Sequence, residues 1–195
     1  KVLVIINDPC HNPTGYTMSS DEWDQVIRFV NELSLQGPVV ILNDIAYVDY
    51  NTKGSSWKQH FKKYTTLSDN VMAIIAFSTS KTLTAYGARA GAAICITKND
   101  QELQKFINAG IYSARSIWST VNNSAMELFT KVTTEEEYLV PYLKEKQFYV
   151  DLIKERADIL VKEAKEVGLK HYPFREGFFV TLEVKDDTKK EALNL

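Results

Sequence analysis

Four short apolar runs, none of them alternating with polar residues, limit what this chain can fold into. They cover residues Val2–Ile6, Val39–Leu42, Val71–Phe77 and Gly91–Thr97. Each run is far shorter than the roughly 20 residues that a membrane-spanning helix needs. A continuous apolar run of this length is typical of a strand that is buried on both faces. The sequence therefore predicts an α/β domain in which helices cover a mainly parallel sheet.

The stretches between and after these runs have helical patterns. Ser19 to Glu22 form a capping box, apolar residues then recur at helical spacing, and Gly37-Pro38 is expected to end that helix. A short helix is predicted over residues 57–64, and Phe178–Val184 is predicted to be a further strand. Thr133 to Glu136 offer a second helix cap.

The longest helical pattern follows this second cap and ends at Gly168. Such a helix is too long for a compact crossover and is expected to connect two domains. We therefore divide the chain into part of a large domain over residues 1–134, a long connecting helix over 135–168, and the start of a smaller α+β domain over 169–195. Because the chain begins directly in a strand and ends inside a charged segment expected to be helical, we interpret it as an internal piece of a longer polypeptide.

The charge and cysteine content narrow the class of protein. The chain has 23 basic and 25 acidic residues, a net charge of −2, so no strong field attracts nucleic acid or anionic membranes. No signal peptide is visible at the first residues. The two cysteines, Cys10 and Cys95, fit a reducing compartment better than a disulfide scaffold. We expect a cytoplasmic protein.

Three polar clusters each follow one of the predicted strands. They are His11–Gly15, Asp44–Tyr47 and Ser78–Arg89. In open α/β sheets ligands bind beyond the carboxyl ends of the strands, so the three clusters are expected to converge. Taken singly, each has an ordinary structural explanation: the first as a turn, the second as a cap beside a half-buried aromatic ring, and the third as a solvated loop.

Taken together, the clusters carry the groups that one phosphorylated aldehyde needs. A poorly solvated lysine amine such as that of Lys81 attacks carbonyls. Arg89, eight residues further on, with Ser78 and Ser80, supplies donors for a phosphate. Pyridoxal phosphate is such an aldehyde, and its ring nitrogen needs a carboxylate partner, a role that Asp44 can fill.

The same residues resemble the class I aminotransferases, the aspartate aminotransferase-like pyridoxal phosphate enzymes of fold type I. Ser78-Thr79-Ser80-Lys81 followed by Gly87-Ala88-Arg89-Ala90-Gly91 is similar to the family's lysine signature. Asn12-Pro13-Thr14-Gly15 and Asp44-x-x-Tyr47 match its other two landmarks in the same order. The resemblance covers essentially the whole chain.

The resemblance implies a role for each of these residues. Lys81 is expected to bind the cofactor aldehyde and to move the proton between the substrate Cα and C4′ of the cofactor. Asp44 is expected to pair with the pyridinium nitrogen of the cofactor, and Tyr47 is expected to form a hydrogen bond with its phenolic oxygen. Asn12 is expected to bridge that oxygen and the substrate carboxylate. Ser78 and Arg89, with a lesser part for Ser80, are expected to hold the phosphate.

Arg115 has two possible interpretations. It resembles the arginine that, in aspartate-type members, reaches into the neighbouring subunit's site and pairs with the distal carboxylate of the substrate. That role implies acidic substrates and a homodimer with shared sites. The alternative is an ordinary arginine on a helix surface. Arg175, which precedes Glu176-Gly177-Phe178-Phe179, is interpreted as structural.

The sequence lacks other parts that the resemblance implies, above all a C-terminal arginine for the substrate α-carboxylate, so we expect this piece alone to transaminate poorly. The main hypothesis is amino transfer between an amino acid, of aspartate or aromatic type, and a 2-oxo acid. A lyase, decarboxylase or synthase of the same fold stays open, and so does a non-catalytic sensor domain. A Cys10–His11 nucleophile pair is disfavoured, because adjacent residues seldom face each other. The histidines lack metal-ligand spacing.

Overall fold

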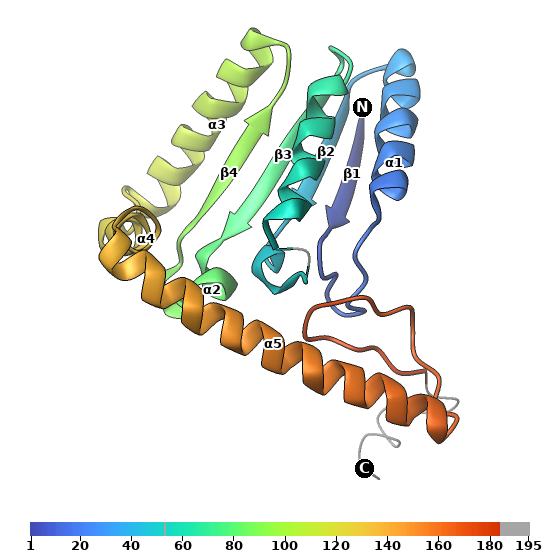
Figure 1. The fold of residues 1–195 in the computed structure, drawn as a ribbon. Coiled ribbons are helices and arrows are strands. Elements are labelled where there is room, and N and C mark those ends of the chain that lie inside the picture. Colours follow the sequence, from blue (N-terminus) through green and yellow to red (C-terminus); the bar gives the residue numbers. More distant parts are fainter. Residues whose placement is uncertain (53, 184–195) are drawn as a thin grey trace.

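Four strands lie side by side in one sheet (Figure 1). The computed structural model of the chain describes residues 1–52 and 54–183. The sheet order is β1-β2-β3-β4, with β1 at Val2–Asn7, β2 at Val39–Asp44, β3 at Val71–Ser78 and β4 at Gly91–Ile96. The first three strands are parallel and β4 is antiparallel to β3. The prediction of a mainly parallel sheet is therefore confirmed.

Two connections join the parallel strands. Helix α1 (Ser20–Leu33) links β1 to β2; the Ser19 side chain and Glu22 form the predicted capping box. The 3₁₀ helix η1 (Ser34–Gln36) and Gly37, with φ of 147°, end this connection. From β2 the chain passes through η2 (Val48–Tyr50) and η3 (Gly54–Thr66) to β3, so the helix predicted over residues 57–64 is present as part of a 3₁₀ helix.

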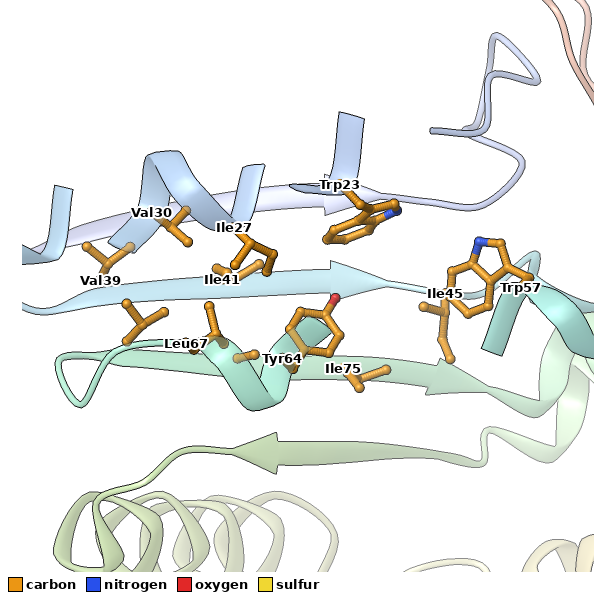
Figure 2. Packing of buried hydrophobic residues seen from close by; sticks show 12 residues of the cluster. Trp23, Ile27, Val30, Val39, Ile41, Ile45, Trp57, Tyr64, Leu67 and Ile75 are labelled. Carbon is orange, nitrogen blue, oxygen red and sulfur yellow. The ribbon is translucent and has the colours of Figure 1, made fainter. Parts of the chain in front are cut away.

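One face of the sheet forms the main hydrophobic core with α1 and η3 (Figure 2). Alternate residues of β2 and β3 point into it, as the burial pattern of both strands shows. The other face is covered less completely, because the residues between them, such as Leu42 and Met72, are only half-buried. The core consists of residues from α1, β2, η3 and β3, with one residue just after β2 and one just after η3: Trp23, Ile27, Val30, Val39, Ile41, Ile45, Trp57, Tyr64, Leu67, Val71, Ala73 and Ile75.

Three helices follow β4. They are α3 (Asp100–Trp118), α4 (Asn123–Thr134) and α5 (Glu136–Glu166). The predicted cap at Thr133 and Thr134 is wrong: both residues belong to α4, where their hydroxyls bond back to the carbonyls of Phe129 and Thr130. Helix α5 begins instead after Glu135, which makes no side-chain capping bond. Figure 1 shows α5 crossing below the edge of the sheet at which β1 and β3 end.

The segment after α5 turns back toward the loop that follows β1. The predicted strand over Phe178–Val184 is not formed in its described part, where only an isolated bridge pairs Leu182 with His171. Beyond this bridge and its flanking bonds, the segment bonds to the loop after β1: the N–H groups of Arg175 and Glu176 donate to the Gly15 carbonyl, and the Thr181 hydroxyl donates to the Pro13 carbonyl. The charged segment predicted to be helical at the end of the chain lies outside the described residues. Within the described part of the chain, no helix is both long enough and apolar enough to cross a membrane.

Ile41 tests the core directly. Its side chain is 0% exposed at the centre of β2, so Ile41→Ala removes buried carbon and leaves a cavity. We expect a loss of about 2–5 kcal/mol in the free energy of unfolding. Urea unfolding followed by circular dichroism measures it. Leu35→Ala is the control, because Leu35 is 86% exposed, and its free energy of unfolding should change by less than about 0.5 kcal/mol. Equal losses in the two variants would contradict the described core.

Candidate active site

The three polar clusters of the sequence meet at one edge of the sheet. The parallel register aligns Asn7 with Asp44, and Asp44 with Ala76. The loops that carry Asn12, Tyr47 and Lys81 therefore leave neighbouring strands at nearly the same level. This is the carboxyl edge, where open α/β sheets bind ligands.

The loop after β1 is anchored to the end of β2. Asn7 bridges the two: its Oδ1 accepts from the backbone N–H of Asn12 at 2.7 Å, and its Nδ2 donates to the Asp44 carbonyl at 3.1 Å. Gly15 has φ of 68°, and a Cβ there would overlap the Phe174 ring and the Phe179 carbonyl. Only glycine fits this conformation and this space. The loop is thus held on one side by β1 and β2 and on the other by the C-terminal segment.

Tyr47 and Asn12 are directly bonded. The Nδ2 of Asn12 donates to the Tyr47 hydroxyl oxygen at 3.0 Å. The Tyr47 ring is buried, with the rings of Phe178 and Phe179 packed edge-on at 5.3 and 5.4 Å between centroids. Because the hydroxyl oxygen already accepts from Asn12, its own proton is available to donate to a ligand.

Asp44 ends β2 with part of its carboxylate free for a ligand. One carboxylate oxygen, Oδ1, accepts from the backbone N–H of Ala46 at 2.9 Å. The other accepts no hydrogen bond from any residue that the structure describes. The side chain is half-buried. A carboxylate of this kind can pair with a protonated ring nitrogen.

Lys81 follows β3 on a helix of one turn, α2 (Thr79–Thr82). Its Nζ lies 4.1 Å from the centroid of the Tyr86 ring and 5.6 Å from that of Tyr47. Both distances are within the range of a cation–π contact. No carboxylate forms an ion pair with Lys81 among residues 1–52 and 54–183. The amine therefore lies between two aromatic rings, next to the Asn12–Tyr47 pair.

The predicted phosphate-binding residues lie around the start of α2. The Ser78 hydroxyl caps this turn by accepting from the Ser80 N–H at 3.2 Å. Thr79 donates from its N–H and its hydroxyl to the Ala90 carbonyl, which brings the backbone that follows Arg89 beside Ser78. The Arg89 guanidinium itself is exposed and donates to the Tyr86 carbonyl at 2.8 Å. Ser78 and Ser80 are thus hydrogen-bonded to each other. Arg89 is linked to them only through the backbone of the next residue, Ala90, which accepts from Thr79.

Cys10 and His11 do not form a nucleophile–base pair. Cys10 is 1% exposed, and burial raises the pKa of its thiol well above the ordinary range, so it stays protonated. The His11 ring bonds the Thr14 hydroxyl at 2.8 Å instead. Among the described residues, no three His, Cys, Asp or Glu side chains are grouped as ligands for a metal ion.

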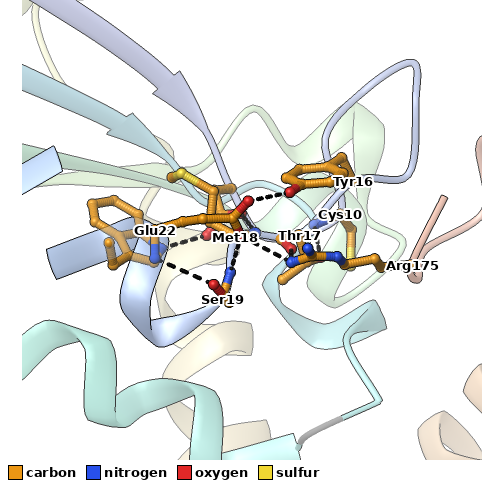
Figure 3. Close-up of polar contacts among 9 residues, drawn as sticks. Cys10, Tyr16, Thr17, Met18, Ser19, Glu22 and Arg175 are labelled. Atoms are coloured by element: carbon orange, nitrogen blue, oxygen red, sulfur yellow. Dashed lines mark hydrogen bonds and ion pairs between the residues drawn. The ribbon is translucent and has the colours of Figure 1, made fainter. Parts of the chain in front are cut away.

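Arg175 braces the Asn12 loop from outside (Figure 3). Its Nη1 donates to the Thr17 carbonyl at 2.7 Å and to Glu22 Oε2 at 3.0 Å, and its guanidinium lies over the Tyr16 ring at 4.4 Å. Glu22 also accepts from the Tyr16 hydroxyl and from the Ser19 N–H. These contacts support the structural interpretation of Arg175.

The sequence profile described as "Aminotransferase class I and II" matches residues 1–194 of this chain. The chain belongs to that family.

Individual relatives agree with this assignment. The aromatic-amino-acid aminotransferase of Pseudomonas aeruginosa is 26% identical over 137 residues, which cover 69% of this chain and 32% of the relative. A crystal structure of an aminotransferase from Anaerococcus prevotii is 34% identical with a TM-score of 0.86, over 91% of this chain and 44% of that one. The aromatic-amino-acid aminotransferase of Burkholderia pseudomallei, solved covalently bound to pyridoxal phosphate, shares the fold at 23% identity and a TM-score of 0.73, over 90% and 43%. This chain therefore spans less than half the length of these aminotransferases.

Arg115 is not part of the assembled cluster. It lies near the end of α3, where its Nη1 donates to the carbonyl and the hydroxyl of Ser119 at 2.9 and 3.1 Å. Within the described chain it contacts none of the other predicted site residues. The distal-carboxylate role depends on a neighbouring subunit, so it stays a prediction.

The structure adds residues that sequence reasoning missed. Tyr86 approaches the Lys81 amine, and Tyr50 donates to the Lys81 carbonyl at 3.0 Å. Phe178 and Phe179 form the wall beside Tyr47. Tyr86 and Tyr50 stand within a few residues of the motifs, which was the available signal. The two phenylalanines lie over 130 positions from Tyr47, and no local pattern links them to it.

The hydrogen bonds that the Glu22 carboxylate accepts predict that the stability of the fold depends on pH. The hydrogen bond from the Ser19 backbone, followed by that from Tyr16, lowers the pKa of Glu22 from its ordinary 4.5 to about 2. A carboxylate with a lowered pKa stabilises the fold above its unfolded value, and this contribution is lost as the pH falls. Glu22→Gln should therefore be less stable than the parent at pH 6, and the difference should shrink between pH 4.5 and 2.

Urea unfolding at fixed pH values measures this difference. Glu32→Gln is the matched control, because Glu32 is exposed on the same helix and forms no ion pair within the described residues. The difference in the free energy of unfolding between Glu32→Gln and the parent should not shrink in this pH range. A Glu22→Gln difference that stayed constant from pH 6 to 2 would contradict the assigned role of the carboxylate.

Proposed function

We propose that this chain is the cofactor-binding part of a pyridoxal phosphate-dependent aminotransferase that moves an amino group between an amino acid and a 2-oxo acid. The observation that carries the proposal is the Asn12–Tyr47 hydrogen bond beside the Lys81 amine, at the carboxyl edge of the sheet. Membership of the class I and II aminotransferases supports it.

The cofactor supplies, when bound, an aldehyde for an amine and a protonated ring that withdraws electrons from the substrate Cα. Lys81 is the amine in this proposal. Its Nζ would hold the aldehyde of the bound cofactor, and the same nitrogen would move the proton between the substrate Cα and C4′ of the cofactor. The absence of an ion pair within the described chain supports this role, because no carboxylate occupies the place beside the amine where a carbonyl ligand would bind.

Asp44 and Tyr47 would hold the cofactor ring in this proposal, through its nitrogen and its phenolic oxygen respectively. Asp44 keeps the ring nitrogen protonated through the oxygen that has no partner in the described residues. Tyr47 donates its free proton to the phenolic oxygen while Asn12 fixes the orientation of the hydroxyl group. From the loop after β1, Asn12 also contacts the substrate carboxylate in this proposal.

Ser78, Ser80 and Arg89 bind the phosphate in this proposal. The two serines lie together at the start of α2, and Arg89 follows within the adjoining loop. The Arg89 guanidinium bonds only the Tyr86 carbonyl among the described residues, which leaves most of its donors for an anion.

We propose aspartate or aromatic amino acids as donors, in agreement with the name of the Pseudomonas aeruginosa relative. We further propose a cytoplasmic homodimer in which Arg115 completes the neighbouring site. The chain divides in this proposal into part of the cofactor domain (1–134), a connecting helix (135–168) and the start of the small domain (169–195), whose residues from 184 onward lie outside the described part.

Replacing Lys81 tests the cofactor assignment. The intact protein, mixed with pyridoxal phosphate, should give the absorbance band of a lysine-bound aldehyde and should transfer amino groups from aspartate, tyrosine or alanine to 2-oxoglutarate. Lys81→Ala should abolish the band and slow transfer at least about 100-fold, because both the covalent bond and the proton transfer are lost. The control is Lys98→Ala, an exposed lysine just after β4. A band that survives in Lys81→Ala rejects the assignment, and a band without amino transfer favours the lyase or sensor alternatives.

Replacing Arg115 tests the substrate assignment. If its guanidinium pairs with a distal carboxylate, Arg115→Ala should lower kcat/KM for aspartate about 10- to 100-fold, the effect of losing a charged hydrogen bond. Turnover of tyrosine should change less than about twofold, because tyrosine has no distal carboxylate. Arg156→Ala, an exposed arginine on α5, is the control. If Arg115→Ala turns over each substrate as fast as the parent does, the distal-carboxylate role is wrong and Arg115 is an ordinary arginine on the helix surface.

A further inference from the structure

The turn that carries Lys81 ends with carbonyl groups in need of donors. Helix α2 has only four residues, and the last carbonyls of any helix lack partners within that helix. The N–H of Leu83 donates to the Thr79 and Lys81 carbonyls, and the N–H of Thr84 to that of Lys81 at 3.3 Å. These bonds close the short turn itself, and the two bonds from Thr79 to the Ala90 carbonyl anchor its start.

Two tyrosine hydroxyls donate to the end of this turn from other elements. Tyr50, in η2, donates to the Lys81 carbonyl at 3.0 Å, and Tyr142, in α5, donates to the Thr82 carbonyl at 2.7 Å. Burial raises the pKa of both tyrosines, so the hydroxyls stay protonated and act as donors at neutral pH. The two accepting carbonyls are consecutive in the chain, and the two hydroxyls come from different elements.

Each tyrosine is itself held in place. The Tyr50 ring packs edge-on against Phe178, with 5.0 Å between the ring centroids. The Tyr142 ring lies 5.1 Å from the Nζ of Lys146 one helical turn further along α5. Lys146 in turn forms an ion pair with Asp49, next to Tyr50, at 2.7 Å with both side chains about three-quarters buried. The ion pair therefore fixes α5 to η2, the two elements that provide the hydroxyls.

We propose that Tyr142 and Tyr50 are positioning residues that clamp the Lys81 turn and so fix where the lysine amine lies. With both carbonyls held, the turn presents the amine between the rings of Tyr86 and Tyr47. Loss of the Tyr142 hydroxyl leaves the Thr82 carbonyl without a donor in the described chain, and loss of the Tyr50 hydroxyl leaves the Lys81 carbonyl with donors from its own turn alone. Either change lets the turn rotate, which moves the amine off the Tyr86 ring and into water. The functional meaning of the clamp rests on the proposed role of Lys81, but the position of the amine can be measured without it.

The test is competitive labelling of lysine amines with acetic anhydride, read by mass spectrometry. It uses the intact protein freed of any bound aldehyde with hydroxylamine, and the measured quantity is the labelling of Lys81 relative to exposed Lys98. Tyr142→Phe removes only the hydroxyl and keeps the ring. It should raise the ratio about fivefold, the factor that corresponds to one lost hydrogen bond. Tyr50→Phe should raise the ratio in the same way.

Tyr149→Phe is the matched control. Tyr149 lies on the same helix and lines the same cavity of about 390 Å³ as Tyr142, but its hydroxyl forms no hydrogen bond with the described residues. The labelling of Lys81 relative to Lys98 in Tyr149→Phe should equal that in the parent. An unchanged ratio in Tyr142→Phe, or an equal rise in Tyr149→Phe, overturns the clamp. Because no cofactor is present in this measurement, the outcome is separate from that of the Lys81→Ala absorbance test: either proposal can fail while the other stands.

Discussion

The parallel pairing of β1, β2 and β3 in a single register is the constraint on which the site depends. It places Asn7, Asp44 and Ala76 at one level, so that the loops leaving the three strands start from one line. Burial fixes this register. Asn43 points into the core, where its Nδ2 donates to the Tyr64 hydroxyl at 3.0 Å, and Asp44 therefore points to the opposite face. A slip of one residue would exchange the two and bury the carboxylate in the apolar core.

Helix α5 connects two loops of the site that are far apart in the sequence. Near its start, Tyr142 bonds the turn of Lys81. Beyond its end, the backbone of Arg175 and Glu176 bonds Gly15, in the loop of Asn12. Glu176 is buried and accepts from the N–H and the hydroxyl of Thr52 at 2.5 and 2.7 Å, which ties this segment also to the chain after β2. A shift of α5 would therefore act on the Lys81 turn and the Asn12 loop together.

The sequence predicted the four strands of the sheet and the convergence of the three clusters, because both follow from local patterns and from the general rule for carboxyl edges. The strand predicted over Phe178–Val184 is not formed in its described part. The reversal of β4 was not predicted. Apolar runs carry no direction, and the reason lies in the link between the strands: α2 and η4 (Tyr86–Ala88) are single turns, too short to cross the sheet as α1 does. The bond from Tyr142 to Thr82 was not predictable either, because it depends on the path of α5 and not on any spacing in the sequence.

The Lys81 amine has aromatic rather than acidic neighbours in the described chain. In the described chain no ion pair joins Lys81 to Asp44. The groups beside the Lys81 amine are the rings of Tyr47 and Tyr86. A carboxylate in their place would form an ion pair with the amine. An aromatic ring attracts a cation more weakly and accepts no proton. The rings of Tyr47 and Tyr86 thus contact the amine without forming an ion pair with it.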